Sequence, residues 1–384
     1  MKSLLLILTH PRYFAPAFVF ASLNIWFGTW AIYIPTVKEK LAISKADLGI
    51  ALFFLALGVF TIFPVASKII NRIGVGRTTW WGVLFCTVTA VLPLAAPSYE
   101  TLCASLYLFG LSNGITDIAM NTLVTELEKE YKVQIMSAAH GFFSLGGVIA
   151  GVGSFLIPVL DNPILHMSTV AAIVVLVNLF FKKQYISIQS APVEKEPFSL
   201  RLFKPLFFLG LIGFISFASE GAIVDWSALY LKEVTLAPEQ FFGAGFLAFS
   251  IAMTLGRFLG DGISEQIGSI KIVALGAVVA ILGYVGILYE NSVLAISGFA
   301  LTGLGFSVMV PELFRIGGKV KGVDSAQGIA FIAGIGYLGF LSGPVILGFL
   351  AEEYGLKSSF WTLLICAILV LVLTGVLKKS GDRN

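Results

Sequence analysis

Long apolar runs recur along the whole chain and are separated by short polar connections. A helix needs about 20 apolar residues to cross the hydrocarbon core of a bilayer. Runs of that length predict twelve helices, over residues 14–37, 47–70, 78–96, 100–125, 135–160, 164–182, 204–231, 240–263, 270–289, 292–316, 325–351 and 358–377. No run alternates apolar and polar residues over the length of a barrel strand. The pattern therefore predicts an all-α integral membrane protein.

Composition supports this class and excludes others. Hydrophobic residues make up 57% of the chain and charged residues 12%, against roughly 25% charged residues in ordinary soluble domains. The three cysteines, Cys86, Cys103 and Cys366, are widely spaced and are interpreted as small buried hydrophobes. We expect no metal site, no cofactor and no nucleic-acid partner. Neither a paired-Asp motif nor a Ser–His motif is recognisable, so we do not expect an intramembrane enzyme.

The distribution of positive charge predicts the orientation of the chain. If the N-terminus is cytoplasmic, 20 of the 25 Lys and Arg residues fall in inner segments and 5 fall in outer segments. Positive charge favours the cytoplasmic side of a membrane. Both termini are therefore expected in the cytoplasm and the protein in the inner membrane, with an even number of helices.

The longest polar connection, residues 185–203, divides the chain near its middle. It predicts an N-terminal six-helix bundle over 1–184, a cytoplasmic linker, and a C-terminal six-helix bundle over 204–384. A weak internal repeat supports two related bundles, because Gly74 aligns with Gly268 at an offset of 194 residues. The same offset brings Asp117 next to Glu312.

Three carboxylates lie inside runs that are otherwise apolar. Asp117 lies in LYLFGLSNGITDIAMNTLV, and Glu220 and Asp225 lie in FISFASEGAIVDWSALYL. A carboxylate at mid-membrane depth costs roughly 2.5–3.5 kcal/mol on insertion scales. A single such acid is equally well explained as a neutral, hydrogen-bonded residue packed inside the bundle. Three acids, together with His140 and several asparagines, favour a solute or proton pathway.

Several motifs resemble those of the major facilitator superfamily. The loop NRIGVGR (71–77) resembles the superfamily's signature loop between helices two and three, with Asn71 where Asp is usual. GRFLGD (256–261) resembles the matching signature after helix eight. More narrowly, AHGFFSLGG (139–147), EGAIVDW (220–226) and GYLGFLSGPVILGFLAEEYGLKSSF (336–360) resemble a bacterial branch near the fucose-permease-like carriers. The chain lacks the helix-four arginine and the helix-five Gly-Pro motif of proton-linked drug exporters.

The resemblance implies two pseudo-symmetric bundles in which helices one, four, seven and ten line a central cavity. Asn113, Asp117 and Asn121 are spaced i, i+4, i+8 and therefore form one polar stripe on a helix. The tryptophans of helix one can face the cavity or form a lipid-facing or interfacial stripe. The candidate substrate-binding residues are Asn24, Trp26, Trp30, Asn113, Asp117, Asn121 and Glu220.

Asp117, Glu220 and His140 are the candidates for proton coupling. A histidine near Asp117 would suit a proton relay, whereas a lone histidine is more often a packing residue. Asp225 and Trp226 lie nearer the outer surface and are expected to form an external gate or an interfacial anchor. The candidate gating charges at the inner ends of helices are Arg72, Arg77, Arg257 and Asp261. The alternative for this group is simple positive-inside anchoring of the chain. Glu312 and Arg315 are also gating candidates, and they have the i, i+3 spacing of an intrahelical pair at the inner mouth.

The sequence thus predicts a secondary transporter that works by alternating access and is coupled to protons. Symport of a sugar or polyol is the first choice, from the resemblance and from the polar and aromatic residues. The alternatives are export of amphipathic compounds or drugs in exchange for protons and, from another class, a membrane sensor that transports nothing. We expect a monomer in the lipid bilayer whose partners are a small-molecule substrate and protons.

Overall fold

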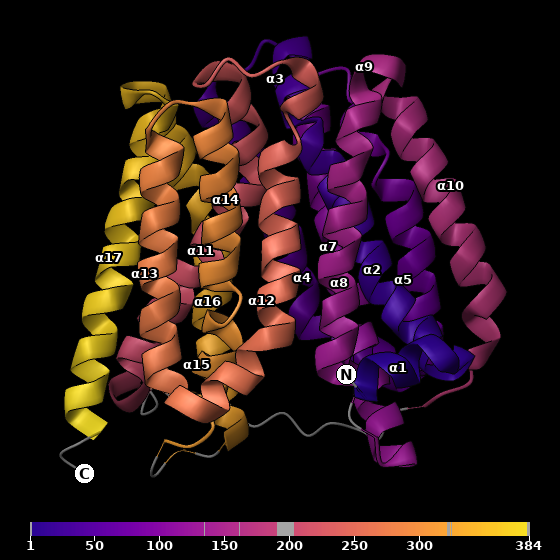
Figure 1. Ribbon diagram of the computed structural model, residues 1–384. Helices are drawn as coiled ribbons and strands as arrows, with labels where there is room; N and C mark the ends of the chain where they lie inside the picture. The colour runs from indigo at the N-terminus through magenta and orange to yellow at the C-terminus, as the bar shows by residue number, and fades with distance from the viewer. Residues whose placement is uncertain are drawn as a thin grey trace. The chain divides into compact units, whose positions relative to one another are not determined.

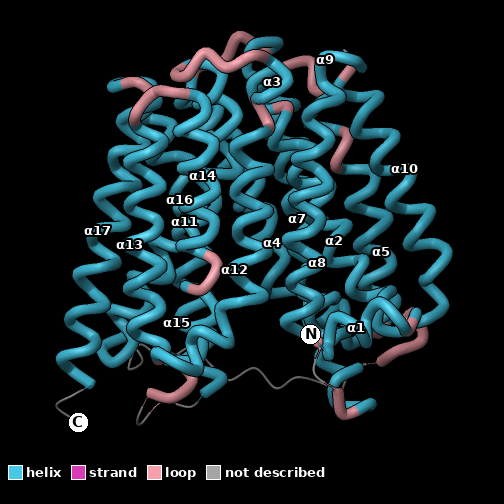
Figure 2. The backbone as a smooth tube through the Cα atoms, viewed as in Figure 1, coloured by secondary structure: helices cyan, strands magenta, loops and turns pink. Residues whose placement is uncertain are grey.

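The computed structural model describes residues 2–133, 135–160, 162–189, 203–320, 323 and 325–381. Within these ranges the chain is built from helices and connecting loops, with no strand (Figure 2). Twelve candidate spans are long and apolar enough to cross a membrane. This confirms the predicted all-α membrane fold and its twelve spans, with most ends within a few residues of the predicted bounds.

The chain divides into two compact units, Met1–Ile43 with Ile50–Glu194 and Ser44–Gly49 with Lys195–Asn384. The division falls within residues 185–203, which the sequence predicts to be a linker. Most of that segment, residues 190–202, lies outside the described part of the chain. The predicted boundaries at 184 and 204 therefore stay a prediction.

The first unit contains six spanning helices (Figure 1). They are α2 (Pro11–Ile32), α4 (Lys45–Ile73, apart from its first turn), α5 (Val75–Thr89), α7 (Tyr99–Tyr131), α8 (Met136–Gly153) and α10 (Pro163–Phe181). Shorter helices are α1 (Lys2–Thr9), α3 (Ile34–Lys40), α6 (Leu92–Ala95) and α9 (Ile157–Leu160). Figure 1 shows α1 lying crosswise to the long helices of this unit.

Local capping explains where two of these helices begin. At the start of α7, the Thr101 backbone N–H donates to Ser98 Oγ (3.4 Å) and the Ser98 N–H donates to Thr101 Oγ1 (3.0 Å). At the start of α10, Asn162 Oδ1 accepts from the Leu165 N–H at 3.0 Å, and Pro163 occupies the first turn. These side chains satisfy backbone groups that have no partner within the helix.

Small residues and polar side chains tie the helices of the first unit together. α2 packs closely on α8, where a Cβ at Gly146 would overlap the carbonyl of Ala21. Asn24 Nδ2 on α2 donates to the Phe143 carbonyl of α8 at 2.9 Å. Close backbone approach of this kind is a common way for membrane helices to associate.

The second unit contains the other six spans. They are α11 (Phe203–Glu233), α12 (Ala244–Ile267), α13 (Ser269–Leu288), α14 (Ser292–Phe306) followed by α15 (Met309–Gly317), α16 (Ser325–Tyr354) and α17 (Leu356–Gly381). α11 packs on α16, where a Cβ at Gly339 would overlap the carbonyl of Phe214. Phe214 lies 193 residues beyond Ala21, and Gly339 lies 193 residues beyond Gly146. The same close contact thus occurs at matching positions of both units, which supports the internal repeat.

The tenth span, predicted over 292–316, runs over Ser292–Gly317, but its helix is interrupted within the span. α14 ends at Phe306 and α15 begins at Met309, with a turn between them. Pro311 gives the physical reason, because it has no N–H to donate to the carbonyl four residues earlier and its ring crowds that carbonyl. An interrupted span at this place bears on function, since broken helices often mark solute sites in transporters.

Candidate functional site

In the first unit, one amide of the polar stripe on α7 contacts Asp117. Asn121 Nδ2 donates to Asp117 Oδ1 at 3.2 Å and to the Asp117 carbonyl at 2.9 Å. Asn113 Nδ2 donates to the Phe109 carbonyl at 2.9 Å, and all three polar side chains are half-buried. Among the described residues, none forms an ion pair with Asp117. Its carboxyl group therefore has a neutral partner and no counter-charge among these residues.

In the second unit, Glu220 is paired with an arginine on the next span. Glu220 Oε1 lies 3.4 Å from Arg257 Nη2, and the two side chains are 25% and 20% exposed. Glu220 lies on α11 and Arg257 on α12. The sequence singles out both residues but does not predict this pair, because no local spacing relates positions on different helices.

A second arginine extends the polar contacts of α12 towards α15. Arg315 Nη1 lies 2.7 Å from Glu312 Oε1 and donates to Ser264 Oγ at 3.0 Å. Ser264 follows Arg257 by seven residues and so lies on the same face of α12. One face of α12 thus carries Arg257, which pairs with Glu220, and Ser264, which contacts Arg315 of the second pair. The intrahelical pair predicted from the spacing of Glu312 and Arg315 is present.

The interruption between α14 and α15 lies next to this network. Ser216, one helical turn before Glu220, donates to Met309 Sδ at 3.4 Å. Glu312 lies in the first turn of α15, where the helix dipole favours negative charge. Its side chain is 3% exposed, and its Oε2 has no hydrogen-bond partner among the described residues. A buried acid at a broken helix is suited to bind a proton or a polar solute.

The structure corrects the alternatives for the tryptophans. Trp26 and Trp30 are fully buried, so the lipid-facing interpretation is wrong. Their indole N–H groups have no acceptor among the described residues. Trp226 is also buried, as is Asp225 at 3% exposed, so the interfacial-anchor alternative is wrong as well. An external gate at these two positions stays a prediction.

Other predicted residues are not brought together. The His140 side chain is exposed, and its ring lies 5.0 Å from the Phe20 ring, centroid to centroid. Asp117 forms no described contact with it, so the structure does not show the expected relay. Arg72 and Arg77 are exposed and form no ion pair with a described residue, which is consistent with positive-inside anchoring. The side chain of Asp261, on α12, lies outside the described residues.

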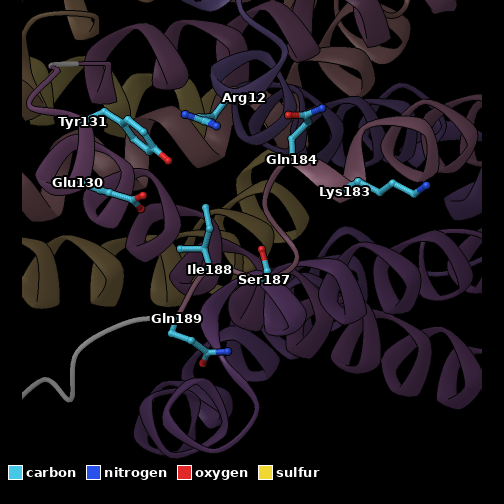
Figure 3. A pocket seen from close by; sticks show the side chains of 8 residues that line it. All are labelled: Arg12, Glu130, Tyr131, Lys183, Gln184, Ser187, Ile188 and Gln189. Atoms are coloured by element: carbon cyan, nitrogen blue, oxygen red, sulfur yellow. The ribbon is translucent and has the colours of Figure 1, made fainter.

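Sequence reasoning missed a polar cavity at one end of the first unit. Its volume is about 400 Å³. It is lined by Arg12, Glu130, Tyr131, Lys183, Gln184, Ser187, Ile188 and Gln189 (Figure 3). The guanidinium of Arg12 lies 4.5 Å from the centre of the Tyr131 ring. Three separate segments form this cavity, so no motif or periodicity points to it. In the described part of the chain, no cluster of His, Cys, Asp and Glu has the composition of a metal site.

Comparisons with known proteins give a consistent family. The model of the Major Facilitator Superfamily matches residues 15–322. The chain is 31% identical to "Uncharacterized transporter y4wD" of Sinorhizobium fredii over 93% of its own length and 95% of that protein. It is also 31% identical to "Membrane protein MosC" of Rhizobium meliloti, over 93% and 88% of the two chains.

Solved structures share the fold at low sequence identity. A point mutant of the nucleoside transporter NupG superposes with a TM-score of 0.76 at 12% identity, over 96% of this chain and 99% of that one. A bacterial homolog of the human lysosomal transporter Spinster superposes with a TM-score of 0.71 at 13% identity, over 95% and 96%. At these identities the likeness concerns the fold and not the substrate.

Proposed function

Because the chain belongs to the Major Facilitator Superfamily, and so is a multi-pass membrane transporter and not an enzyme, we propose that it moves a small polar solute by proton-coupled alternating access. A sugar or polyol carried in symport is the first choice. The narrower resemblance to fucose-permease-like carriers and the amide and indole groups of the first unit support that choice. We also propose a monomer in the inner membrane with both termini in the cytoplasm, on the distribution of Lys and Arg.

The observation that carries the proposal is the Glu220–Arg257 pair inside two spanning helices. A proton on Glu220 removes its negative charge and weakens the pair, and loss of that proton restores it. A contact with two such states lets proton binding bias a conformational equilibrium. Arg257 also keeps the deprotonated form of Glu220 from being an uncompensated charge.

Asp117 supports a second coupling site of a different kind. Without a basic partner among the described residues, its charged form is stable only while water reaches it, since burial disfavours charge. We therefore propose that Asp117 takes up a proton when its part of α7 is closed off from water. Asn113 and Asn121 on the same stripe supply neutral donors and acceptors to a polar solute.

The test uses purified protein in proteoliposomes with an imposed pH gradient and radiolabelled D-glucose, L-fucose and D-mannitol. We expect Asp117→Asn and Glu220→Gln each to lower gradient-driven uptake about tenfold, within the usual range of coupling free energies. Exchange of solute without a gradient should persist, because it moves no net proton. Glu100→Gln and Glu239→Gln are matched controls, since both acids are exposed near helix ends.

Gradient-driven uptake that survives in both variants would contradict the coupling assignment. Ethidium leaving the same vesicles in exchange for protons, with no uptake of the three solutes, would favour the exporter alternative. A protein that moves none of these compounds but binds one of them would favour the sensor.

A further inference from the structure

A short segment after α10 folds back onto the corner between α4 and α5 of the first unit. We call residues 185–189 the strap. The Gly76 N–H at the start of α5 donates to the Ile188 carbonyl of the strap at 3.1 Å. Just before the strap, the Lys182 ammonium lies 4.9 Å from the centre of the Trp80 ring on α5. The strap is therefore fixed to this corner by backbone and side-chain contacts.

Tyr185 anchors the strap by burial. Its side chain is fully buried, and its hydroxyl has no hydrogen-bond partner among the described residues. Burial raises the pKa of that hydroxyl above its usual value. The ring therefore holds the strap through apolar packing, and its hydroxyl adds no described contact.

The strap also has internal order. The Ile186 N–H donates to the Lys182 carbonyl at 3.0 Å, and the Ile188 N–H donates to the Tyr185 carbonyl at 3.0 Å. Ser187, Ile188 and Gln189 form one wall of the polar cavity (Figure 3). The segment thus packs on α5 and also borders the cavity that contains Arg12.

The α4–α5 corner of the first unit differs from the matching corner of the second unit at the position that contacts the strap. Gly74 and Gly268 have nearly the same backbone angles, φ 92° and ψ 148° against φ 89° and ψ 152°. Two residues later the first unit has Gly76, where a Cβ would overlap the Tyr185 carbonyl oxygen. The second unit has Ile270 at that place, and a Cβ at Gly268 would meet no described atom within 4 Å. The strap therefore covers this corner in the first unit, whereas no described residue covers the corresponding corner in the second.

We propose that the strap is a latch that ties the connection between the two halves to the α4–α5 corner. The connection to the second unit continues from the strap, so the docked strap fixes the point at the α4–α5 corner from which that connection starts. The docked strap also immobilises the corner, whose backbone N–H at Gly76 it satisfies. The corresponding corner at Gly268 has no such anchor among the described residues.

Hydrogen–deuterium exchange on the full chain in lipid nanodiscs tests the latch. Gly76→Ala should free the strap and raise exchange about tenfold in residues 183–189 and in residues 74–79, as expected when a local contact opens. Gly375→Ala is the matched control, because that helical glycine has no described atom within 4 Å of an added Cβ. It should leave both peptides unchanged.

A second pair of variants tests the contact between the strap and α5 by removing atoms from Tyr185. Tyr185→Ala should raise exchange in both peptides, whereas Tyr185→Phe should not, because the lost hydroxyl has no described partner. This pair decides the question if Gly76→Ala does not fold, as judged by exchange in residues 269–306. Unchanged exchange of the strap in folded Gly76→Ala and Tyr185→Ala would overturn the proposal. A freed strap beside an unchanged corner would overturn it equally.

Discussion

Asp117 of the first unit and Glu220 and Glu312 of the second unit are held in the membrane in different ways. In the first unit, Asp117 accepts a hydrogen bond from the Asn121 amide and has no described ion pair. In the second unit, Glu220 and Glu312 are each paired with an arginine. The internal repeat makes this contrast informative, because related backbones carry different charge arrangements.

The contrast separates two ways of tolerating a carboxylate in a membrane. An arginine neutralises the charge directly, so removing it leaves a buried charge whose cost is large. An amide offers hydrogen bonds without neutralising anything, so the acid must be protonated or hydrated. The partners of Glu220 and Glu312 should therefore matter more to stability than the partner of Asp117.

Arg315→Met should give the largest effect. It leaves the Glu312 carboxylate, 3% exposed, without its cation. We expect the free energy of unfolding to fall by about 3 kcal/mol, the low end of the range for breaking a buried pair because Arg315 itself is 35% exposed. Steric-trapping measurements of unfolding in bicelles would check this value.

The double variant Glu312→Gln/Arg315→Met is the control for that prediction. Removing the negative charge as well should restore most of the lost stability, since replacing both members of a buried pair is often nearly neutral. A double variant as unstable as Arg315→Met would show that the loss comes from arginine packing instead.

Arg257→Met should have a smaller effect of the same sign. Glu220 and Arg257 are 25% and 20% exposed, and Glu220 Oε1 lies 3.4 Å from Arg257 Nη2. Solvent therefore screens the charge of Glu220 more than it screens the charge of Glu312. We expect a loss of about 1–2 kcal/mol, discounted from the value for a fully buried pair. The same unfolding assay measures it, with Glu220→Gln/Arg257→Met as the control. A loss larger than that of Arg315→Met would reverse the proposed ranking.

The sequence predicts the spans and the α7 stripe because both depend on local periodicity. Twenty apolar residues define a span wherever they occur, and i, i+4 spacing places Asn113, Asp117 and Asn121 on one face of any helix. Pro311 also indicates the break before α15, but the prediction from hydropathy treated α14 and α15 as one helix. In each case the signal lies within one segment of chain.

Contacts between segments could not be predicted in this way. The Glu220–Arg257 pair depends on how α11 and α12 rotate about their axes, which composition does not determine. Trp26 and Trp30 have the same pattern whether they face lipid or the interior, so only packing decided between the two. The strap left one visible sign, Gly76 opposite Ile270 in the repeat, and its meaning depends on the fold.

Asn121→Ala should have the smallest effect on stability and so tests the first half of the comparison. It removes a neutral donor group that Asp117 Oδ1 and the Asp117 carbonyl share, a contribution of about 0.5–1.5 kcal/mol, while alanine favours the helix by a few tenths. We expect a net loss of about 1 kcal/mol or less in the same assay. Asp117→Asn should also be nearly neutral in stability although it lowers gradient-driven uptake. A loss of about 3 kcal/mol in Asn121→Ala, as for removal of a charged partner, would show that the amide compensates Asp117 as an arginine would, and the contrast between the units would then fail.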